Sequence, residues 1–569
     1  MRCYPTANTE SAACGAALSY ILFNGEICAM GIARKNSAKA LKIGCLAVFV
    51  ILLTIYYIYH QNTQLVASDN CSMFQIMIDF LQGNYLMKNW VVGTASFAFT
   101  DTIWCLPGLL MGVHVPRIMS FCGALFHAGF VAVVLYLTLR DEIEKGSIKN
   151  CTMAFFASAI YLMLIAVVPY SGYTMENPTY LYLNLNLHAG AFMFIAIEIM
   201  ILYLWWKNDY KGKVYPIIFT VYGILGQMSD GTPLMIFFGP LCVYCAYYLV
   251  WPNVDKNNKK NVFLIADSIL IVVAAAAINK LITLIGGLKI LGVNYALNTP
   301  GIAFRNAKLL VIRLLNLLGY DTKYGISITP YVVVVSLIIV LISLSVVFQL
   351  FMALKSKPDR LGLLLSLGIV SNVMGVLFIW SGYDTVSARH IMSIPFFGAA
   401  LVVKFILYFT DKKRFATKML VVFVLSISLF YAAYNIVKVK DLPNYNADGE
   451  AVAAYINEKG GGTGYGALWI YTTISAYTDF ESTIIPIRWD GWGVGFYRHY
   501  LLINTEWYNE SGIHYVVLQS NEGDLYSAGG NRTDFLKFAG EPDEDMVFGI
   551  YEVMYYEQDL SQYDLGTTY

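Results

Sequence analysis

The chain has 569 residues, of which 57% are hydrophobic and 13% are charged, with 38 basic and 38 acidic side chains. A soluble protein carries roughly 25% charged residues, so the composition excludes an ordinary cytosolic enzyme, a disordered chain and a nucleic-acid binder. The ten cysteines are too few for a small disulfide scaffold. Apolar runs of about 20 residues, the length that crosses a bilayer, predict a polytopic membrane protein.

The charges are unevenly distributed along the chain. Residues 438–569 hold seven basic and 20 acidic residues and no cysteine, whereas the preceding part holds 31 basic and 18 acidic residues. The sequence therefore predicts an all-α membrane domain over 41–437, followed by a small acidic α/β domain over 438–569. Without cysteine, that domain is not a disulfide-stapled ectodomain.

The first apolar run covers Leu41–Tyr59, and residues 1–40 form an N-terminal cytoplasmic extension. The extension lacks the charge and length pattern of a signal peptide. We expect its first 29 residues to be disordered or to follow from a mis-assigned start, with Met30 as the more natural one. Basic residues before the first run place its N-terminal end in the cytoplasm: Arg34, Lys35, Lys39 and Lys42.

Ten further apolar runs lie near 118–139, 151–170, 187–206, 214–228, 233–251, 262–285, 328–354, 361–380, 391–410 and 416–437. Basic clusters recur in every second loop between them, near 140–149, 207–213, 256–260, 355–360 and 412–418. Eleven spans with a cytoplasmic N-terminus place every cluster inside. The C-terminal domain then lies outside the cell membrane.

The segment Asp101–Val113 is apolar enough to suggest one more span. A full span here would reverse every later loop, so we interpret it as a re-entrant or interfacial segment. The longest outer loops are 60–117 and 286–327. Because binding and catalytic residues are often carried by loops, we expect the functional site in these long segments outside the bilayer.

Three carboxylates in the first outer loop are candidate catalytic bases: Asp69, Asp79 and Asp101. Apolar residues around Asp79 repeat at helical spacing, which indicates a helix along the membrane surface. The alternative is that these acids are solvated loop residues or helix caps.

Acidic and histidine side chains also mark the outer ends of later runs. Asp230 lies in a short loop between two runs, where it orients a ligand or simply forms a turn. His188 begins another run and is either structural or substrate-binding. Glu198 lies deeper in that run, where an acid is functional or paired within the bundle.

Candidate phosphate-binding cations lie in two outer segments. Arg389 and His390 begin a late run at its outer end, although basic residues are usually found on the cytoplasmic side. Asp384 lies nearby in the sequence and is either a ligand or a salt-bridge partner of Arg389. The planar guanidinium of Arg suits phosphate. Arg305 and Lys308 lie on an amphipathic segment, Phe304–Leu318, which either borders the site or anchors the chain at lipid headgroups.

This organisation resembles the GT-C superfamily of membrane glycosyltransferases. The resemblance covers roughly 40–440 as architecture, with local similarity at Asp79–Trp90, Phe97–Asp101, Ser229–Asp230 and Ala388–His390. His390 stands where such enzymes often have Tyr after the Arg.

The resemblance implies that a sugar moves from a polyprenyl-phosphate carrier to a glycan or lipid acceptor of the cell envelope, with inversion. Asp69 has the place of the family's usual base, with Asp79 and Asp101 as rivals. The phosphate would meet Arg389, with Arg305, Lys308 or His390. No cofactor is required, although Asp101 and Asp230 could hold a divalent cation.

Other classes remain open on the sequence alone. One is a transporter or flippase for lipid-linked saccharides, against which the chain shows no internal repeat. Another is a non-catalytic envelope assembly protein. A phospho-group transferase usually carries a larger metal-dependent soluble domain.

Within 438–569 the pattern predicts a helix over Ala447–Lys459 and strands over Tyr465–Tyr471, Ser482–Ile487, Tyr515–Gln519 and Val547–Met554. The region is rich in aromatic residues, which either stack on sugar rings or form a core. They are Tyr465, Trp469, Trp489, Trp492, Tyr497, Trp507 and Tyr508.

Overall fold

The computed structural model describes residues 40–58, 68–93, 95–144, 188–251, 258–292, 296–318, 320, 322, 328–380, 386, 388–411, 444, 446–489, 495–499, 501–519 and 532–566. The extension that precedes residue 40, the apolar runs at 151–170 and 416–437, and Asp384 lie outside these ranges.

The N-terminal region is mostly helical, and six of its helices are long and apolar enough to cross a membrane. This is the pattern of a multi-pass membrane protein, and each apolar run predicted within the described ranges coincides with a helix. The apolar helices are Ala40–Ile58, α4 (Val115–Glu144), α7 (Ala189–Lys207), α8 (Val214–Ser229), α9 (Gly239–Val250), α10 (Asn258–Leu284), α12 (Pro330–Leu354), α13 (Arg360–Phe378) and α14 (Ser393–Asp411). Three of these have shorter apolar stretches than a typical span: α8, α9 with its preceding turn (Leu234–Val250), and the part of α14 over Ser393–Phe409.

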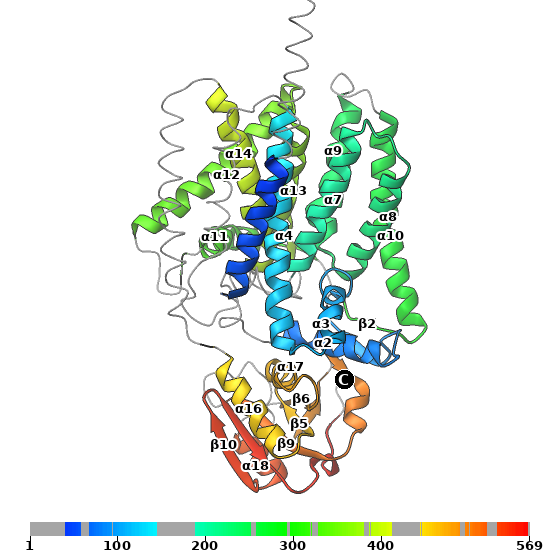
Figure 1. Cartoon of the computed structure of the whole chain (residues 1–569), viewed down its shortest axis with the longest axis vertical. Helices are drawn as coiled ribbons and strands as arrows, with labels where there is room; N and C mark the ends of the chain where they lie inside the picture. The colour runs from blue at the N-terminus through cyan, green and yellow to red at the C-terminus, as the bar shows by residue number, and fades with distance from the viewer. Residues whose placement is uncertain are drawn as a thin grey trace, which may run out of the picture.

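The segment predicted as the first outer loop keeps that name below for its described residues, 68–93 and 95–114, and it lies between the helical bundle and the C-terminal domain (Figure 1). It contains α2 (Ser68–Leu81), β1 (Trp90–Val92), η1 (Thr102–Cys105) and α3 (Leu106–Leu110). The helix predicted around Asp79 is therefore present as α2. Asp101–Val113 forms two short helical turns, and five residues of α3 extend only about 7.5 Å, so this segment does not cross a bilayer.

Short elements connect the later helices. A π-helix precedes α9, and the helix predicted at Phe304–Leu318 is confirmed as α11. These elements are η3 (Leu234–Phe238), β2 (Lys289–Ile290), β3 (Ala296–Leu297), α11 (Pro300–Leu317), β4 (Ile379–Trp380) and the 3-10 helix η4 (Ala388–Ile391).

The C-terminal domain is a mixed α/β sheet with strand order β10-β11-β9-β5-β6-β7. The central strand β5 is parallel to β6 and β9, and the outer pairs are antiparallel. Its elements are α16 (Ala447–Glu458), β5 (Thr463–Gly466), α17 (Leu468–Tyr477), β6 (Thr483–Trp489), β7 (Phe496–Arg498), β8 (Ile503–Asn504), η6 (Thr505–Asn509), β9 (Ile513–Gln519), α18 (Arg532–Ala539), β10 (Glu544–Phe548), β11 (Tyr551–Tyr555) and η8 (Leu560–Gln562).

Two predicted strands are wrong in extent. The strand expected at Tyr465–Tyr471 ends at Gly466, and its second half belongs to α17. The strand expected at Val547–Met554 is a hairpin, because Gly549 adopts a φ of 56° and turns the chain between β10 and β11.

The C-terminal domain and the first outer loop share one hydrophobic core. Phe74 of α2 and Met119 of α4 belong to the same buried cluster as Ile485 and Val517 of the domain. At its edge, β1 pairs with β2 on one side and with β8 of the domain on the other. The domain is therefore fixed to the end of the bundle that carries this loop.

Trp90 joins these parts through three interactions. Its ring packs edge-on against Trp507 at a centroid distance of 5.0 Å, and its Nε1 donates to Asp79 Oδ2 at 2.6 Å. Its backbone pairs with Asn504 in β8. Trp507 and Tyr465 are buried. These two aromatic residues are therefore part of the hydrophobic core and are not exposed for stacking on a sugar ring.

We expect Trp90→Ala to loosen the C-terminal domain from the loop, at a cost of about 3–5 kcal/mol in the free energy of unfolding. Hydrogen exchange in α2 and η6 of the detergent-solubilised chain measures this. Trp104→Ala is the matched control, because Trp104 is half exposed. Equal effects of the two substitutions would contradict the assignment of Trp90 as the joint.

Candidate functional site

Four segments that are distant in sequence meet at the bundle end beside the C-terminal domain. Ser229 holds the first outer loop there: its carbonyl accepts the N–H groups of Ser96 and Phe97 at 3.1 and 3.0 Å, and its Oγ accepts that of Phe99 at 2.8 Å. The start of α7 and the 3-10 helix η4 complete the junction. We call Asp101, His188, Asp230 and His390 the aspartate–histidine cluster.

Asp230 and His188 form a closely bonded pair. His188 Nδ1 lies 2.6 Å from Asp230 Oδ2 and 3.1 Å from Thr232 Oγ1. Burial alone would raise the pKa of the Asp230 carboxyl, but the charge and hydrogen bond of His188 and the bonds from Thr232 lower it overall. Because an ionised carboxylate only accepts hydrogen bonds, Nδ1 carries the proton, and Nε2 is the nitrogen left for a ligand.

His188 connects to the rest of the cluster through ring contacts. Its ring centroid lies 6.3 Å from that of His390 and 5.6 Å from that of Phe97. His188 and Phe97 both have left-handed backbones, with φ of 72° and 51°. Non-glycine residues in this region store strain, which is common at functional sites.

Asp101 lies fully buried at the N-terminus of α7. Its Oδ1 accepts the Gly190 N–H at 3.0 Å, and its Oδ2 accepts the Thr100 hydroxyl at 2.7 Å. A Cβ at position 190 would lie 2.5 Å from Asp101 Cγ and 2.3 Å from the Thr100 carbonyl oxygen. Glycine is thus required at 190, and the positive end of the helix favours the carboxylate.

The predicted cations lie on η4 and α11. Arg389 directly precedes His390 in η4, and the structure describes its backbone but not its side chain. The Nε of Arg313 in α11 donates to the Val386 carbonyl at 3.1 Å, which ties α11 to this segment. Arg305 and Lys308 lie on the exposed face of α11.

The other first-loop carboxylates differ in environment from Asp101. Asp69 lies in the first turn of α2, and its side chain is outside the described part. Asp79 Oδ2 accepts hydrogen bonds from Asn84 Nδ2 and Trp90 Nε1, both at 2.6 Å. Asp79 therefore organises the loop, as in the alternative interpretation of these acids as caps.

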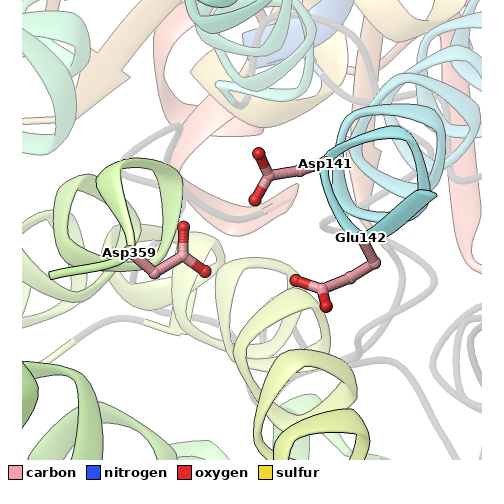
Figure 2. Close-up of side chains that lie close together, drawn as sticks. All are labelled: Asp141, Glu142 and Asp359. Carbon is pink, nitrogen blue, oxygen red and sulfur yellow. The ribbon is translucent and has the colours of Figure 1, made fainter. Parts of the chain in front are cut away.

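A second cluster of carboxylates is formed by Asp141, Glu142 and Asp359 (Figure 2). Asp141 and Glu142 lie in the last turn of α4, which begins beside the first outer loop, so this cluster is at the opposite end of the bundle. One oxygen from each of Asp141, Glu142 and Asp359 falls within 4.8 Å of the others. Lys404 Nζ already lies among them, at 2.6 Å, 3.3 Å and 2.9 Å respectively. These three acids are thus the counter-ions of a buried ammonium, which occupies the place that a metal ion would need.

The sequence alone did not lead us to this ion cluster. Its signal was the presence of charged residues inside or directly at the end of apolar runs, where they are expensive and require a partner. Which partner each one takes depends on packing between α4, α13 and α14, which sequence patterns do not give.

A comparison with models of known protein families gives no match, and a comparison with curated protein sequences gives none. The function is therefore inferred from the residues and geometry of this chain.

We expect Lys404→Met to destabilise the protein by about 3–5 kcal/mol, because it leaves three buried carboxylates without their cation. Lys207→Met is the control: Lys207 is 35% exposed and lies 3.6 Å from Asp141 Oδ1, so its loss costs about 1 kcal/mol or less. Unfolding in detergent measures both, with Lys404→Arg as a conservative variant. An unchanged Lys404→Met protein would contradict the assignment.

Asp230→Asn removes the charge that His188 faces, and we expect a loss of about 1–3 kcal/mol at neutral pH. Because folding lowers the pKa of Asp230, its contribution is complete above about pH 4 and is lost as the pH falls through the lowered value. The difference between parent and variant should therefore shrink in acid. Asp209→Asn, at an exposed turn, is the control in the same unfolding measurements.

Proposed function

We propose that this protein is an integral-membrane glycosyltransferase. It would move a sugar from a polyprenyl-phosphate carrier to a glycan or lipid acceptor of the cell envelope, with inversion at the sugar. In this proposal the chain crosses the membrane eleven times, with the N-terminus in the cytoplasm, and the C-terminal domain and the aspartate–histidine cluster lie on the outer face.

The observation that carries the proposal is the convergence of the first outer loop, α7, α8 and η4 in the aspartate–histidine cluster. Sugar transfer needs a group that accepts the proton of the attacking hydroxyl. His188 Nε2, oriented by Asp230, is one such group in the neutral form of the ring, in which Nδ1 alone carries a proton. Asp69, Asp79 and Asp101 of the first outer loop are the other candidates, and Asp79 and Asp101 each already accept two hydrogen bonds within the protein.

The leaving phosphate needs positive charge where its own charge develops. Arg389 and His390 follow one another in η4, which packs next to α11 with Arg305 and Lys308. This supports a donor that enters from the lipid beside α11, with its phosphate at η4. A divalent cation between Asp101 and Asp230 remains an optional addition to this scheme, because positioned cations can do the same electrostatic work.

The test is transfer by the full chain in proteoliposomes supplied with a series of polyprenyl-phosphate-linked sugars. We expect release of polyprenyl phosphate, and a fall of about 100-fold or more in rate for His188→Ala and Arg389→Ala. Asp69→Asn and Asp101→Asn, compared in the same assay, identify the first-loop base. Asp209→Asn should retain full activity.

Two results would favour the other classes. Movement of the intact lipid-linked saccharide across the bilayer without consumption of donor would indicate a transporter or flippase. Normal envelope function of the His188 and Arg389 variants in cells would indicate a non-catalytic assembly protein.

A further inference from the structure

Glu198 is an acid in the middle of an apolar helix. It lies nine residues from either end of α7, about 14 Å along the axis at 1.5 Å per residue. Its side chain is almost completely buried, and neither carboxyl oxygen has a hydrogen-bond partner among the described residues. Because buried polar groups normally have a hydrogen-bond partner, the unpaired carboxyl group of Glu198 requires an explanation beyond packing.

The carboxyl group lies at the contact of α7, α8 and α10. A Cβ placed on Gly223 of α8 would be 3.3 Å from Glu198 Oε1, so the missing side chain at 223 makes room for the acid. The same point lies 2.8 Å from Ile271 Cδ1 and 3.0 Å from Phe238 Cζ. Glu198 is thus enclosed by apolar side chains on one side and by the α8 backbone on the other.

A second acid, Asp267 of α10, shares this region. It is buried, and its two oxygens lie 2.9 and 3.1 Å from Thr220 Oγ1 of α8. Asp267 and Tyr222 are close enough to interact electrostatically with Glu198. Among the residues the structure describes, the charged group that acts on Glu198 therefore has the same sign as Glu198 itself.

This arrangement differs from the ion cluster around Lys404. There, three carboxylates surround an ammonium. Here Glu198 lies beside Gly223 of α8, and Asp267 is hydrogen-bonded by Thr220, one turn away on the same helix. Two like charges near one another in a low-dielectric region repel strongly. A carboxyl group that is buried without a hydrogen-bond partner or a counter-ion costs less free energy in its neutral form than as a carboxylate.

We propose that Glu198 and Asp267 form an intramembrane proton-binding site, with the exchangeable proton on Glu198. The proton comes from water and converts the carboxylate into a carboxyl group, so no other reactant is consumed. Asp267, whose oxygens are bonded by Thr220, is the charged neighbour that sets how tightly this proton is held. The site lies about 15 Å from His188 along α7 and does not depend on the proposed sugar transfer.

Infrared difference spectra of the full chain in lipid bilayers test the site directly. We expect a carboxyl C=O band of a protonated acid that shifts in D2O, fades as the pH is raised and is absent in Glu198→Gln. Glu506→Gln is the matched control, because Glu506 is exposed in the C-terminal domain. In Asp267→Asn the band should fade at a lower pH, because the neighbouring acid that opposes the ionisation of Glu198 is gone.

A hydrophobic carbodiimide gives an independent readout, since it reacts with protonated carboxyl groups inside membranes. Peptide mass spectrometry should locate the adduct on Glu198, with labelling that declines as the pH is raised. A band that ignores both D2O and pH in the folded chain would overturn the proposal, and so would an unlabelled Glu198. Either result would make Glu198 a sealed, permanently neutral packing residue.

Discussion

The first outer loop must satisfy its buried backbone groups on two sides at once, and the arrangement of the molecule depends on this constraint. On the bundle side, Ser229 accepts three N–H groups of the loop, and Asp101 accepts the Gly190 N–H in the first turn of α7. On the other side, β1 completes a three-stranded sheet with β2 and β8. Because buried amide groups rarely remain unpaired, these bonds fix the loop, the bundle end and the C-terminal domain relative to one another.

This constraint explains which part of the site the sequence could predict. The apolar runs became helices because lipid leaves the backbone no other way to satisfy its polar groups. The sequence indicates Asp230 and His188 as candidates because they stand at the ends of such runs, on the side that the charge pattern predicts to be outer. Their direct contact was not predictable, since 42 residues separate them and only the packing of α7 on α8 brings them together.

Local signals failed where tertiary contacts decided the outcome. The Tyr465–Tyr471 segment has strand-like residues throughout, yet its second half packs as α17 against α2. The roles of Asp79 and Lys404 also follow from distant partners. Asp79 bonds Trp90, and Lys404 bonds carboxylates more than 260 residues away. For the first-loop acids, charge and position indicate importance, and the coordinates show that Asp79 is hydrogen-bonded by Asn84 and Trp90 within the loop.

One rigid element links three regions that have been described separately. α7 receives Asp101 at Gly190, holds Glu198 at its midpoint and ends at Lys207, which faces Asp141. At position 190 the backbone of α7 is in close contact with Thr100 and Asp101 of the loop, without room for a side chain. An axial displacement of α7 at Gly190 would therefore also move Lys207 relative to Asp141, at the opposite end of the helix.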